Sequence, residues 1–461
     1  MKEHRTYELV VIGGGSAGST AAKWAAKRDI PVALVERDRL GGTCLNYGCD
    51  PTKALLHAAG ILHAAKRADS FGLRFPEAGF DWSAVVGHVR DLIAGIRGGT
   101  PEQAAERQQR RGIDVFRGEA SFVSPREVRI DDTTIAGERF LIATGFEPVI
   151  PPIDGIEQAG YITNREAVTL ERLPRTLAVV GAGPVGVEFA QVFSRFGARV
   201  TLFDMNDRIL FKDEADLANE LAECLQDEGV QIRCGSQIKR VAKQDSGDKQ
   251  LVWKDSDGEH SIDVEEILIA SGRKPAIEAL QLENAGVETK DGALVLDETL
   301  RSSVPSIWAA GDITRRFPFT HVASVQAVHA VRNAFSEVPE AFDYLAMPWV
   351  TYTDPALAHV GATTHQLESN GRTFETFEMA LSNIPRNVIT AKRAGRVRLL
   401  AEPDSGRLLG GHILGAGADE LLAPVILAMR HGLPVQALAD TVFPYPTSSA
   451  ALQFAAKQFF K

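Results

Sequence analysis

The chain has 461 residues, too many for one compact core, so two to four domains are expected. With 44% hydrophobic and 24% charged residues, it has the composition of a soluble globular protein. Its net charge of -10 argues against a nucleic-acid partner, and no apolar run approaches the length of a membrane span.

The first predicted strand covers residues 8–12. A glycine-rich turn, an alanine-rich helix from about Ser16 and a second strand, residues 32–35, ending at Glu36 follow it. The turn has the pattern G-x-G-x-x-G, formed by Gly13, Gly15 and Gly18. The first glycine makes the tight turn, the second lets a pyrophosphate approach the backbone, and the third lets helix and strand pack closely. The acid accepts hydrogen bonds from a ribose hydroxyl. This unit predicts a dinucleotide site.

The first predicted strand begins too near Met1 for a signal peptide, so we expect a cytoplasmic protein.

Two cysteines beside glycines come next, Cys44 and Cys49. Thiols five positions apart on a helical turn come close enough to bridge if that turn is distorted. A structural disulfide would be odd in a cytosolic protein. A metal site needs three or four ligands, which no nearby cysteine or histidine supplies. We therefore interpret the pair as redox-active. Cys224 and Cys234 lie apart from it and are predicted to be packing residues, and no metal site is predicted.

A proline-rich linker near residue 150 precedes a repeat of the first unit. Strand 177–180 leads into a second glycine pattern, formed by Gly181, Gly183 and Gly186. A helix follows, and then strand 200–203, which ends at Asp204. The first glycine and the acid each lie 168 positions after their counterparts in the first unit. The repeat predicts a second dinucleotide site.

Beyond the repeat, strand 306–310 leads into a glycine and an aspartate. The C-terminal part mixes strands with helices, predicted at 397–400 and 411–414 for the strands and at 420–431 and 448–459 for the helices. The alternation of apolar and polar residues there indicates a mixed domain of its own.

The cysteine segment, GGTCLNYGCDPTKALL, resembles the active-site segment of the pyridine nucleotide-disulfide oxidoreductases, which include glutathione reductase, dihydrolipoamide dehydrogenase and mercuric reductase. The resemblance extends along the chain through Ala143-Thr144-Gly145, Gly181 to Glu188, Ser271-Gly272-Arg273, Ala310-Gly311-Asp312, Thr320-His321 and Tyr352-Thr353-Asp354-Pro355. It implies an α/β fold with two Rossmann-like FAD- and NAD-binding domains, a C-terminal α+β dimerisation domain and a homodimer. The implied boundaries are 1–150 and 276–345 for the two parts of the FAD-binding domain, 151–275 for the NAD(P)-binding domain and 346–461 for the dimerisation domain.

The resemblance also implies roles for individual residues. Lys53 would lie near the reactive edge of the flavin and pair with Glu188. Cys49 would lie against the isoalloxazine as the charge-transfer thiolate, and Cys44 would face the substrate as the interchange thiol. Hydride would pass from the nicotinamide to the flavin, and electrons from there to the disulfide. The residues placed against the two cofactors are Gly13, Gly15, Ser16, Gly18, Glu36, Arg37, Gly42, Thr43, Lys53, Ala120, Ala143, Thr144, Gly145, Gly181, Gly183, Val185, Gly186, Glu188, Asp204, Gly272, Arg273, Gly311, Asp312, Phe319 and Thr320.

Asp204 bears on which nicotinamide is used, because a carboxylate there accepts from a 2′-hydroxyl and repels a 2′-phosphate. Arg208 follows shortly after, but basic residues occur there in NAD-using relatives as well. The predicted cofactors are therefore FAD and NAD(H), with NAD(H) preferred over NADP(H).

Near its C-terminus the sequence departs from the family. Thiol-reducing members carry His-Pro-Thr-x-x-Glu, contributed across the dimer, whereas this chain has Tyr445-Pro446-Thr447-Ser448-Ser449-Ala450. A phenol with a pKa of about 10 does not cycle a proton at neutral pH as an imidazole of about 6.5 does. Efficient reduction of glutathione disulfide or lipoamide is therefore not expected. Tyr445 resembles the tyrosine of mercuric reductase, or alternatively packs at a dimer interface. Residues 458–461 lack that enzyme's cysteine pair, which weakens mercury as the physiological substrate.

Asp50 is a second departure, since relatives usually have an apolar residue there. Its charge would disfavour the Cys49 thiolate and shift the redox balance. Alternatively, its side chain would serve as a helix-start residue before Pro51.

Two functions fit these observations. An enzyme, similar to disulfide reductases or to mercuric reductase, would pass electrons from NADH through FAD and Cys44–Cys49 to a small acceptor such as a metal ion, a quinone or an unusual disulfide. Alternatively, a non-catalytic flavoprotein would bind NADH and act as a redox sensor or as a subunit of a complex.

Overall fold

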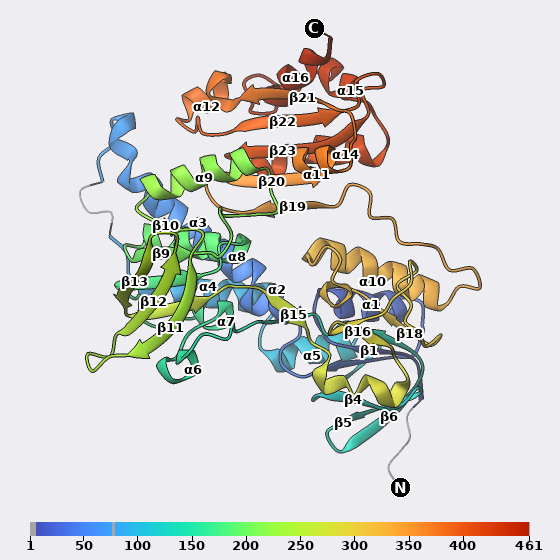
Figure 1. Cartoon of the computed structure of the whole chain (residues 1–461). Coiled ribbons are helices and arrows are strands. Elements are labelled where there is room, and N and C mark those ends of the chain that lie inside the picture. The colour runs from blue at the N-terminus through green and yellow to red at the C-terminus, as the bar shows by residue number, and fades with distance from the viewer. Residues whose placement is uncertain (1–5, 76–78, 461) are drawn as a thin grey trace. The chain divides into compact units, whose positions relative to one another are not determined.

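The computed structural model of the chain describes residues 6–75 and 79–460 (Figure 1). The chain forms two compact units, and each is assembled from separate stretches of sequence. Unit 1 comprises Met1–Thr52, Val86–Val149 and Gly272–Asp343. Unit 2 comprises Lys53–Val85, Ile150–Ser271 and Tyr344–Lys461. The four-part division drawn from the sequence stays a prediction.

Unit 1 is built on a seven-stranded sheet (Figure 1). Its parallel strands are β3 (Ile113–Arg117), β2 (Val32–Glu36), β1 (Thr6–Ile12), β6 (Thr133–Ile142) and β18 (Ile307–Ala309). Beyond β6, the sheet continues with the antiparallel strands β5 (Glu127–Ile130) and β4 (Ala120–Ser124). Strand β2 is buried along its whole length, as expected for an apolar run in a parallel sheet covered on both faces. Helices α1 (Ser16–Ala26) and α10 (Thr320–Ala334) pack against each other.

The chain leaves unit 1 and returns to it at one place. Strand β7 (Phe146–Pro148) pairs antiparallel with β15 (Arg273–Pro275). Directly beyond this pair, the N–H of Val149 donates to the carbonyl of Gly272 at 3.0 Å. All of Ile150–Ser271 therefore lies between two neighbouring points of unit 1.

The first part of unit 2 repeats the nucleotide unit. A four-stranded parallel sheet contains, in order, β10 (Gln231–Arg233), β9 (Arg199–Phe203), β8 (Thr176–Val180) and β14 (Glu266–Ile269). Helix α8 (Pro184–Arg195) follows β8 and starts with a proline, whose missing N–H has no helical partner at that position anyway. The predicted order of strand, glycine turn, helix and strand is confirmed in both copies. A three-stranded antiparallel sheet follows: β11 (Gln237–Lys243), β12 (Lys249–Asp255) and β13 (Gly258–Val264).

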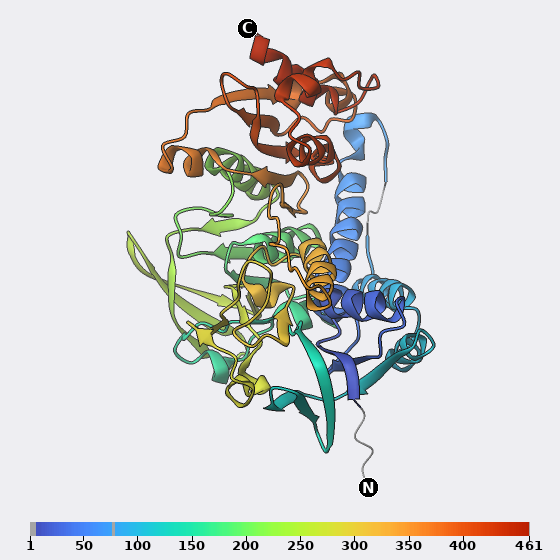
Figure 2. The same cartoon turned by 90° about the vertical axis from the view of Figure 1, so that its right-hand side faces the viewer.

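The second part of unit 2 is an antiparallel sheet with helices packed against it. Its strands, in order, are β19 (Pro348–Thr351), β20 (Ala356–Gly361), β23 (Leu408–Gly415), β22 (Arg396–Ala401) and β21 (Glu375–Ala380). Helix α16 (Ala450–Ala456), drawn in red in Figure 2, packs on β21 and β22. The fold is thus the predicted α/β architecture with a C-terminal α+β domain.

Two predicted C-terminal helices differ in detail. The helix expected over 420–431 is divided into α13 (Ala418–Leu421) and α14 (Ala423–Arg430), because Pro424 lacks the N–H that would continue the first helix. The helix expected over 448–459 ends as α16 at Ala456 and continues as a 3-10 turn. Among the helices of the described residues, none combines the length and the apolar character that crossing a membrane requires.

Candidate functional site

The two glycine turns have the same geometry. The first glycines, Gly13 and Gly181, have φ of 104° and 108°, a region that side chains disfavour. A Cβ on Gly13 would lie 2.4 Å from the carbonyl oxygen of Ala143, and one on Gly181 would lie 2.5 Å from that of Ala270. At the third glycine of each turn, a Cβ would lie 1.8 Å from the carbonyl oxygen of the first. Only glycine fits these positions.

The middle glycines, Gly15 and Gly183, face open space instead. A Cβ on Gly15 would have only the Cα of Gly42 nearby, at 3.9 Å, and one on Gly183 would meet nothing within 4 Å. Each is the N-cap of its helix without a side-chain cap, so the N–H groups of the first turn are left for another acceptor. This is the cradle that a pyrophosphate needs, and the residues therefore fit FAD in unit 1 and a nicotinamide dinucleotide in unit 2.

The acid at the end of each second strand holds its own glycine turn. The carboxylate of Glu36 accepts from the N–H of Gly14 at 2.6 Å and from that of Asp38 at 2.7 Å. Asp204 accepts from the N–H of Ala182 at 2.6 Å and from that of Asn206 at 2.8 Å. These donors lie 168 positions after Gly14 and Asp38. Burial raises the pKa of Glu36, and its backbone donors partly offset the rise. The sequence repeat is thus also a repeat of hydrogen bonds.

The distortion that a bridge between the two cysteines requires is present. Helix α2 (Gly42–Tyr47) ends at Gly48, whose φ of -132° and ψ of -106° are not helical, and α3 (Cys49–Lys66) starts directly after it. Cys44 and Cys49 are free thiols on consecutive helices and are hydrogen-bonded to each other. The break at Gly48 therefore brings together two sulfur atoms that a continuous helix would separate.

Thr320 and Asp50 act on the thiol pair in opposite directions. The hydroxyl of Thr320, at the start of α10, lies 3.2 Å from Cys49 Sγ. The hydrogen bond to Cys49 and burial raise the pKa of the Cys44 thiol; Thr320 lowers it and the charge of Asp50 raises it further. Asp50 also occupies the first turn of α3. Its position is compatible with both roles left open by the sequence.

The predicted ion pair of Lys53 lies in unit 2. The ammonium donates to both carboxylate oxygens of Glu188 on α8, at 2.9 and 2.7 Å. The Glu188 side chain is only 4% exposed and also accepts from the N–H of Tyr352 at 2.9 Å. Tyr352 belongs to a recognised motif but received no role from the sequence. Tyr352 lies more than 150 residues beyond α8 in the sequence, so this contact is evident only in the folded structure.

In unit 1, Asp312 begins a short turn after β18. Its carboxylate pairs with Arg273 at 3.0 Å; burial raises its pKa, and the arginine lowers it. A Cβ on the preceding Gly311 would lie 3.1 Å from that of Ala17, which places Asp312 beside the start of α1. The Thr144 hydroxyl oxygen, next to the first glycine turn, is buried and has no hydrogen-bond partner among the described residues. An unsatisfied buried hydroxyl next to the cradle fits a bound group.

The other predicted cofactor residues occupy varied positions. Arg37 is engaged by Glu119 and Glu147, at 3.0 and 2.5 Å. Val185 is 38% exposed in the first turn of α8, and Phe319 is the N-cap of α10. The remaining unit 1 residues are Ser16 at the start of α1, Gly42 and Thr43 in α2, Ala120 in β4, Gly145 before β7 and Gly272 before β15.

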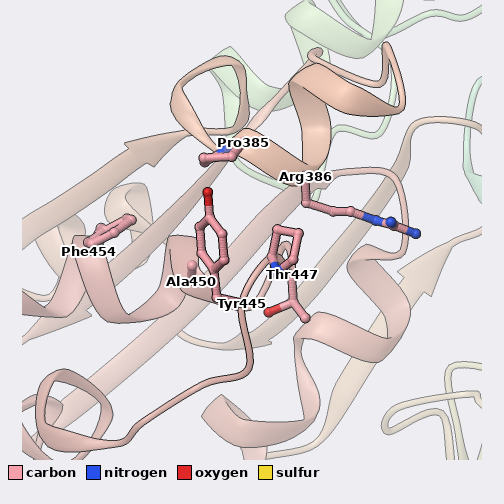
Figure 3. Close-up of a pocket in the computed structure, with 7 residues that line it drawn as sticks. Pro385, Arg386, Tyr445, Thr447, Ala450 and Phe454 are labelled. Atoms are coloured by element: carbon pink, nitrogen blue, oxygen red, sulfur yellow. The ribbon is translucent and has the colours of Figure 1, made fainter.

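Tyr445 lies at an apolar cavity of about 70 Å³ in unit 2 (Figure 3). The cavity is lined by Pro385, Arg386, Tyr445, Pro446, Thr447, Ala450 and Phe454. Figure 3 shows the phenol directed toward Pro385, with Ala450 beside it and the Arg386 guanidinium directed away. The tyrosine is 81% exposed. The described residues that line this cavity include neither an imidazole nor a carboxylate, so they offer no group that cycles a proton at neutral pH.

Within the described residues, no group of three or more histidine, cysteine, aspartate or glutamate side chains is arranged to hold a metal ion. Among the described residues, the thiols of Cys44 and Cys49 are therefore the candidate ligands for a soft metal ion.

Similarity to known proteins extends over nearly the whole chain. The family described as pyridine nucleotide-disulphide oxidoreductase matches residues 7–327, and the dimerisation domain of that family matches residues 347–456. The chain is 35% identical to the mercuric reductase of Streptomyces lividans, over 100% of this chain and 97% of that protein. It is 31% identical to the dihydrolipoyl dehydrogenase of Bacillus subtilis (strain 168), over 96% of each. Among solved structures, it is similar to the Cu(II) complex of the HOCl-induced flavoprotein disulfide reductase RclA from Escherichia coli. The TM-score is 0.88 and the identity 29%, with 98% of this chain and 99% of that chain covered.

Proposed function

The chain belongs to the pyridine nucleotide-disulphide oxidoreductase family, and we propose that it is a homodimeric enzyme that reduces a soft metal ion with NADH through FAD and the Cys44–Cys49 pair. Bound FAD supplies a centre that accepts a hydride and returns electrons to sulfur. The observation that carries the proposal is an intact thiol pair combined with a Tyr445 cavity that lacks both members of the acid–base dyad.

Proton supply favours a metal ion over a disulfide. Reducing a disulfide requires a proton for each departing thiolate, and no imidazole at residue 445 supplies it. One NADH gives two electrons to a divalent soft ion, or one electron to each of two ions, and releases one proton. The thiols of Cys44 and Cys49 give up their protons as the cation binds, because the thiolate is the ligand. The similarity to mercuric reductases and to a protein solved with Cu(II) supports this acceptor class.

Anaerobic titration of the purified flavoprotein with NADH tests the electron path. A long-wavelength absorbance band that appears before the flavin bleaches is expected if electrons reach the thiols. Addition of Hg²⁺ or Cu²⁺ should then give many turnovers of NADH. Bleaching without such a band, followed by less than one turnover with either ion, would instead support the non-catalytic redox sensor.

Restoring the dyad should restore disulfide reduction. The double variant Tyr445→His/Ala450→Glu supplies an imidazole and a carboxylate at the two positions that line the Figure 3 cavity. We expect lipoamide or glutathione disulfide reduction to rise at least about tenfold, because general acid–base catalysis typically contributes more than that. Steady-state NADH oxidation with each disulfide measures the effect. Tyr445→Phe is the control, and an equal gain in that variant would contradict the proton-supply argument.

The contacts of Arg208 support NADH as the electron donor. Its guanidinium donates to the carbonyl oxygens of Leu210, Phe211 and Asp213, at 2.9, 2.6 and 3.1 Å. These bonds engage it with its own loop, so it is not held ready for a 2′-phosphate. Asp204, in turn, keeps a carboxylate at the position that a ribose hydroxyl would approach.

We therefore expect kcat/KM to be at least about tenfold higher with NADH than with NADPH, the size of one charged hydrogen bond. Asp204→Asn keeps an acceptor for its glycine turn but removes the charge, and should narrow this ratio about tenfold. Asp207→Asn removes the same charge from an exposed neighbouring position and serves as the matched control. A ratio that changes equally in both variants would show a general charge effect instead.

A further inference from the structure

One face of α8 contacts the segment that opens the C-terminal part of unit 2. Glu188, Gln191 and Arg195 follow one another at helical spacing, so they share that face. Gln191 accepts from the N–H of Asp354 at 2.9 Å and donates to its carbonyl at 2.8 Å. Arg195, 2% exposed, donates to the same carbonyl at 3.0 Å. The backbone of this segment is therefore fixed against α8 by two side chains besides Glu188.

The same segment places an aromatic ring on Lys53. The N–H of Tyr352 donates to Glu188 at 2.9 Å, and the Lys53 ammonium lies 4.6 Å from the centre of the Tyr352 ring. That distance lies within the range of a cation–π interaction. The ammonium therefore lies within reach of both a buried carboxylate and an aromatic face.

The two partners affect the lysine charge differently. The carboxylate of Glu188 neutralises it, whereas the ring attracts the cation without adding a charge. The N–H of Tyr352 also donates to the Glu188 carboxylate, which weakens the attraction between that carboxylate and Lys53. Lys53 is 35% exposed, so without the ring its ammonium would be held by Glu188 alone on one side and open to solvent on the other.

We propose that Tyr352 is a positioning residue that keeps the Lys53 ammonium in place and its charge effective toward the bound flavin. This inference rests on the proposed function, because Lys53 serves the flavin only if FAD binds as proposed. The role belongs to the ring, since the N–H bond to Glu188 is made by the backbone and survives a change of side chain.

The test measures the flavin redox equilibrium in the FAD-loaded dimer. The variants are Tyr352→Leu, which removes the ring, and Tyr352→Phe, which keeps it. Each protein is reduced anaerobically with dithionite in the presence of a reference dye, and the flavin spectrum is recorded. We expect Tyr352→Leu to lower the equilibrium constant for flavin reduction about three- to tenfold, the size of one partly exposed cation–π contact. Tyr352→Phe should behave as the wild type, and Tyr352→Met replaces the leucine variant if that protein does not fold.

Two results would overturn the inference: a flavin equilibrium and spectrum unchanged in Tyr352→Leu, or an equal change in Tyr352→Phe, which would assign the effect to the hydroxyl. Dithionite reduces the flavin whether or not NADH does, so this test does not depend on the physiological donor. Failure of NADH to reduce the wild type would contradict the proposed function and leave the Tyr352 result to be judged on its own.

Discussion

Replacing Cys44 by serine is expected to lower kcat with Hg²⁺ or Cu²⁺ at least about a hundredfold, as loss of a nucleophile that acts in a unit does. The reason is chemical: a serine hydroxyl neither binds a soft cation nor forms the disulfide with Cys49. NADH should still reduce the bound flavin, because the glycine cradles and the Lys53–Glu188 pair are unchanged. Stopped-flow absorbance separates flavin reduction from turnover in the same sample.

Cys224→Ser supplies the matched control. Cys224 lies in α9 (Ala215–Asp227), and burial raises its pKa to about 11, so it stays a protonated thiol at neutral pH. Its loss removes one thiol from the chain without touching the active pair, and turnover should match the wild type. Full metal-ion turnover in Cys44→Ser would show that electrons pass from flavin to acceptor without the thiols.

The second large effect concerns the Lys53–Glu188 pair. Lys53→Met leaves the Glu188 carboxylate buried, with the Tyr352 N–H as a remaining donor. We expect a loss of about 2 kcal/mol in the free energy of unfolding, below the usual range for a broken buried pair because Lys53 is 35% exposed. Flavin reduction by NADH should slow about ten- to a hundredfold if, as proposed, Lys53 supplies positive charge near the reduced ring.

The double variant Lys53→Met/Glu188→Gln separates the two effects. It removes the unpaired charge, so much of the lost stability should return, whereas flavin reduction should stay slow. Thermal denaturation of the FAD-loaded protein and stopped-flow reduction measure the two quantities. Recovery of both in the double variant would mean that Lys53 acts only by neutralising Glu188.

The parts predicted from the sequence depend on local constraints. Gly13 and Gly181 are required by positive φ and by a carbonyl less than 3 Å away, so a pattern of glycines reveals them directly. A bridge between two cysteines on one helical turn likewise requires a distorted turn, and the structure places that distortion at Gly48.

The missed parts depend on contacts between distant segments. The polar side chains of α8 at residues 188, 191 and 195 have the spacing of a solvent-exposed face, yet they are buried against residues more than 150 positions away. No local sequence pattern distinguishes a polar helix face that is exposed to solvent from one that is buried against a distant segment. The cavity beside Tyr445 is equally non-local, since α12 (Pro385–Ile389) supplies one of its walls.

The paired strands β7 and β15 have a consequence for the layout of the molecule. Because residues 149 and 272 are joined by a hydrogen bond, the host sheet closes without the stretch between them. Insertion of a domain is tolerated where its two ends leave and re-enter a host at neighbouring points. The second nucleotide unit has these ends and repeats the first at a fixed offset. The chain therefore has the layout of a nucleotide-binding domain with a second, similar nucleotide unit inserted between two of its paired strands.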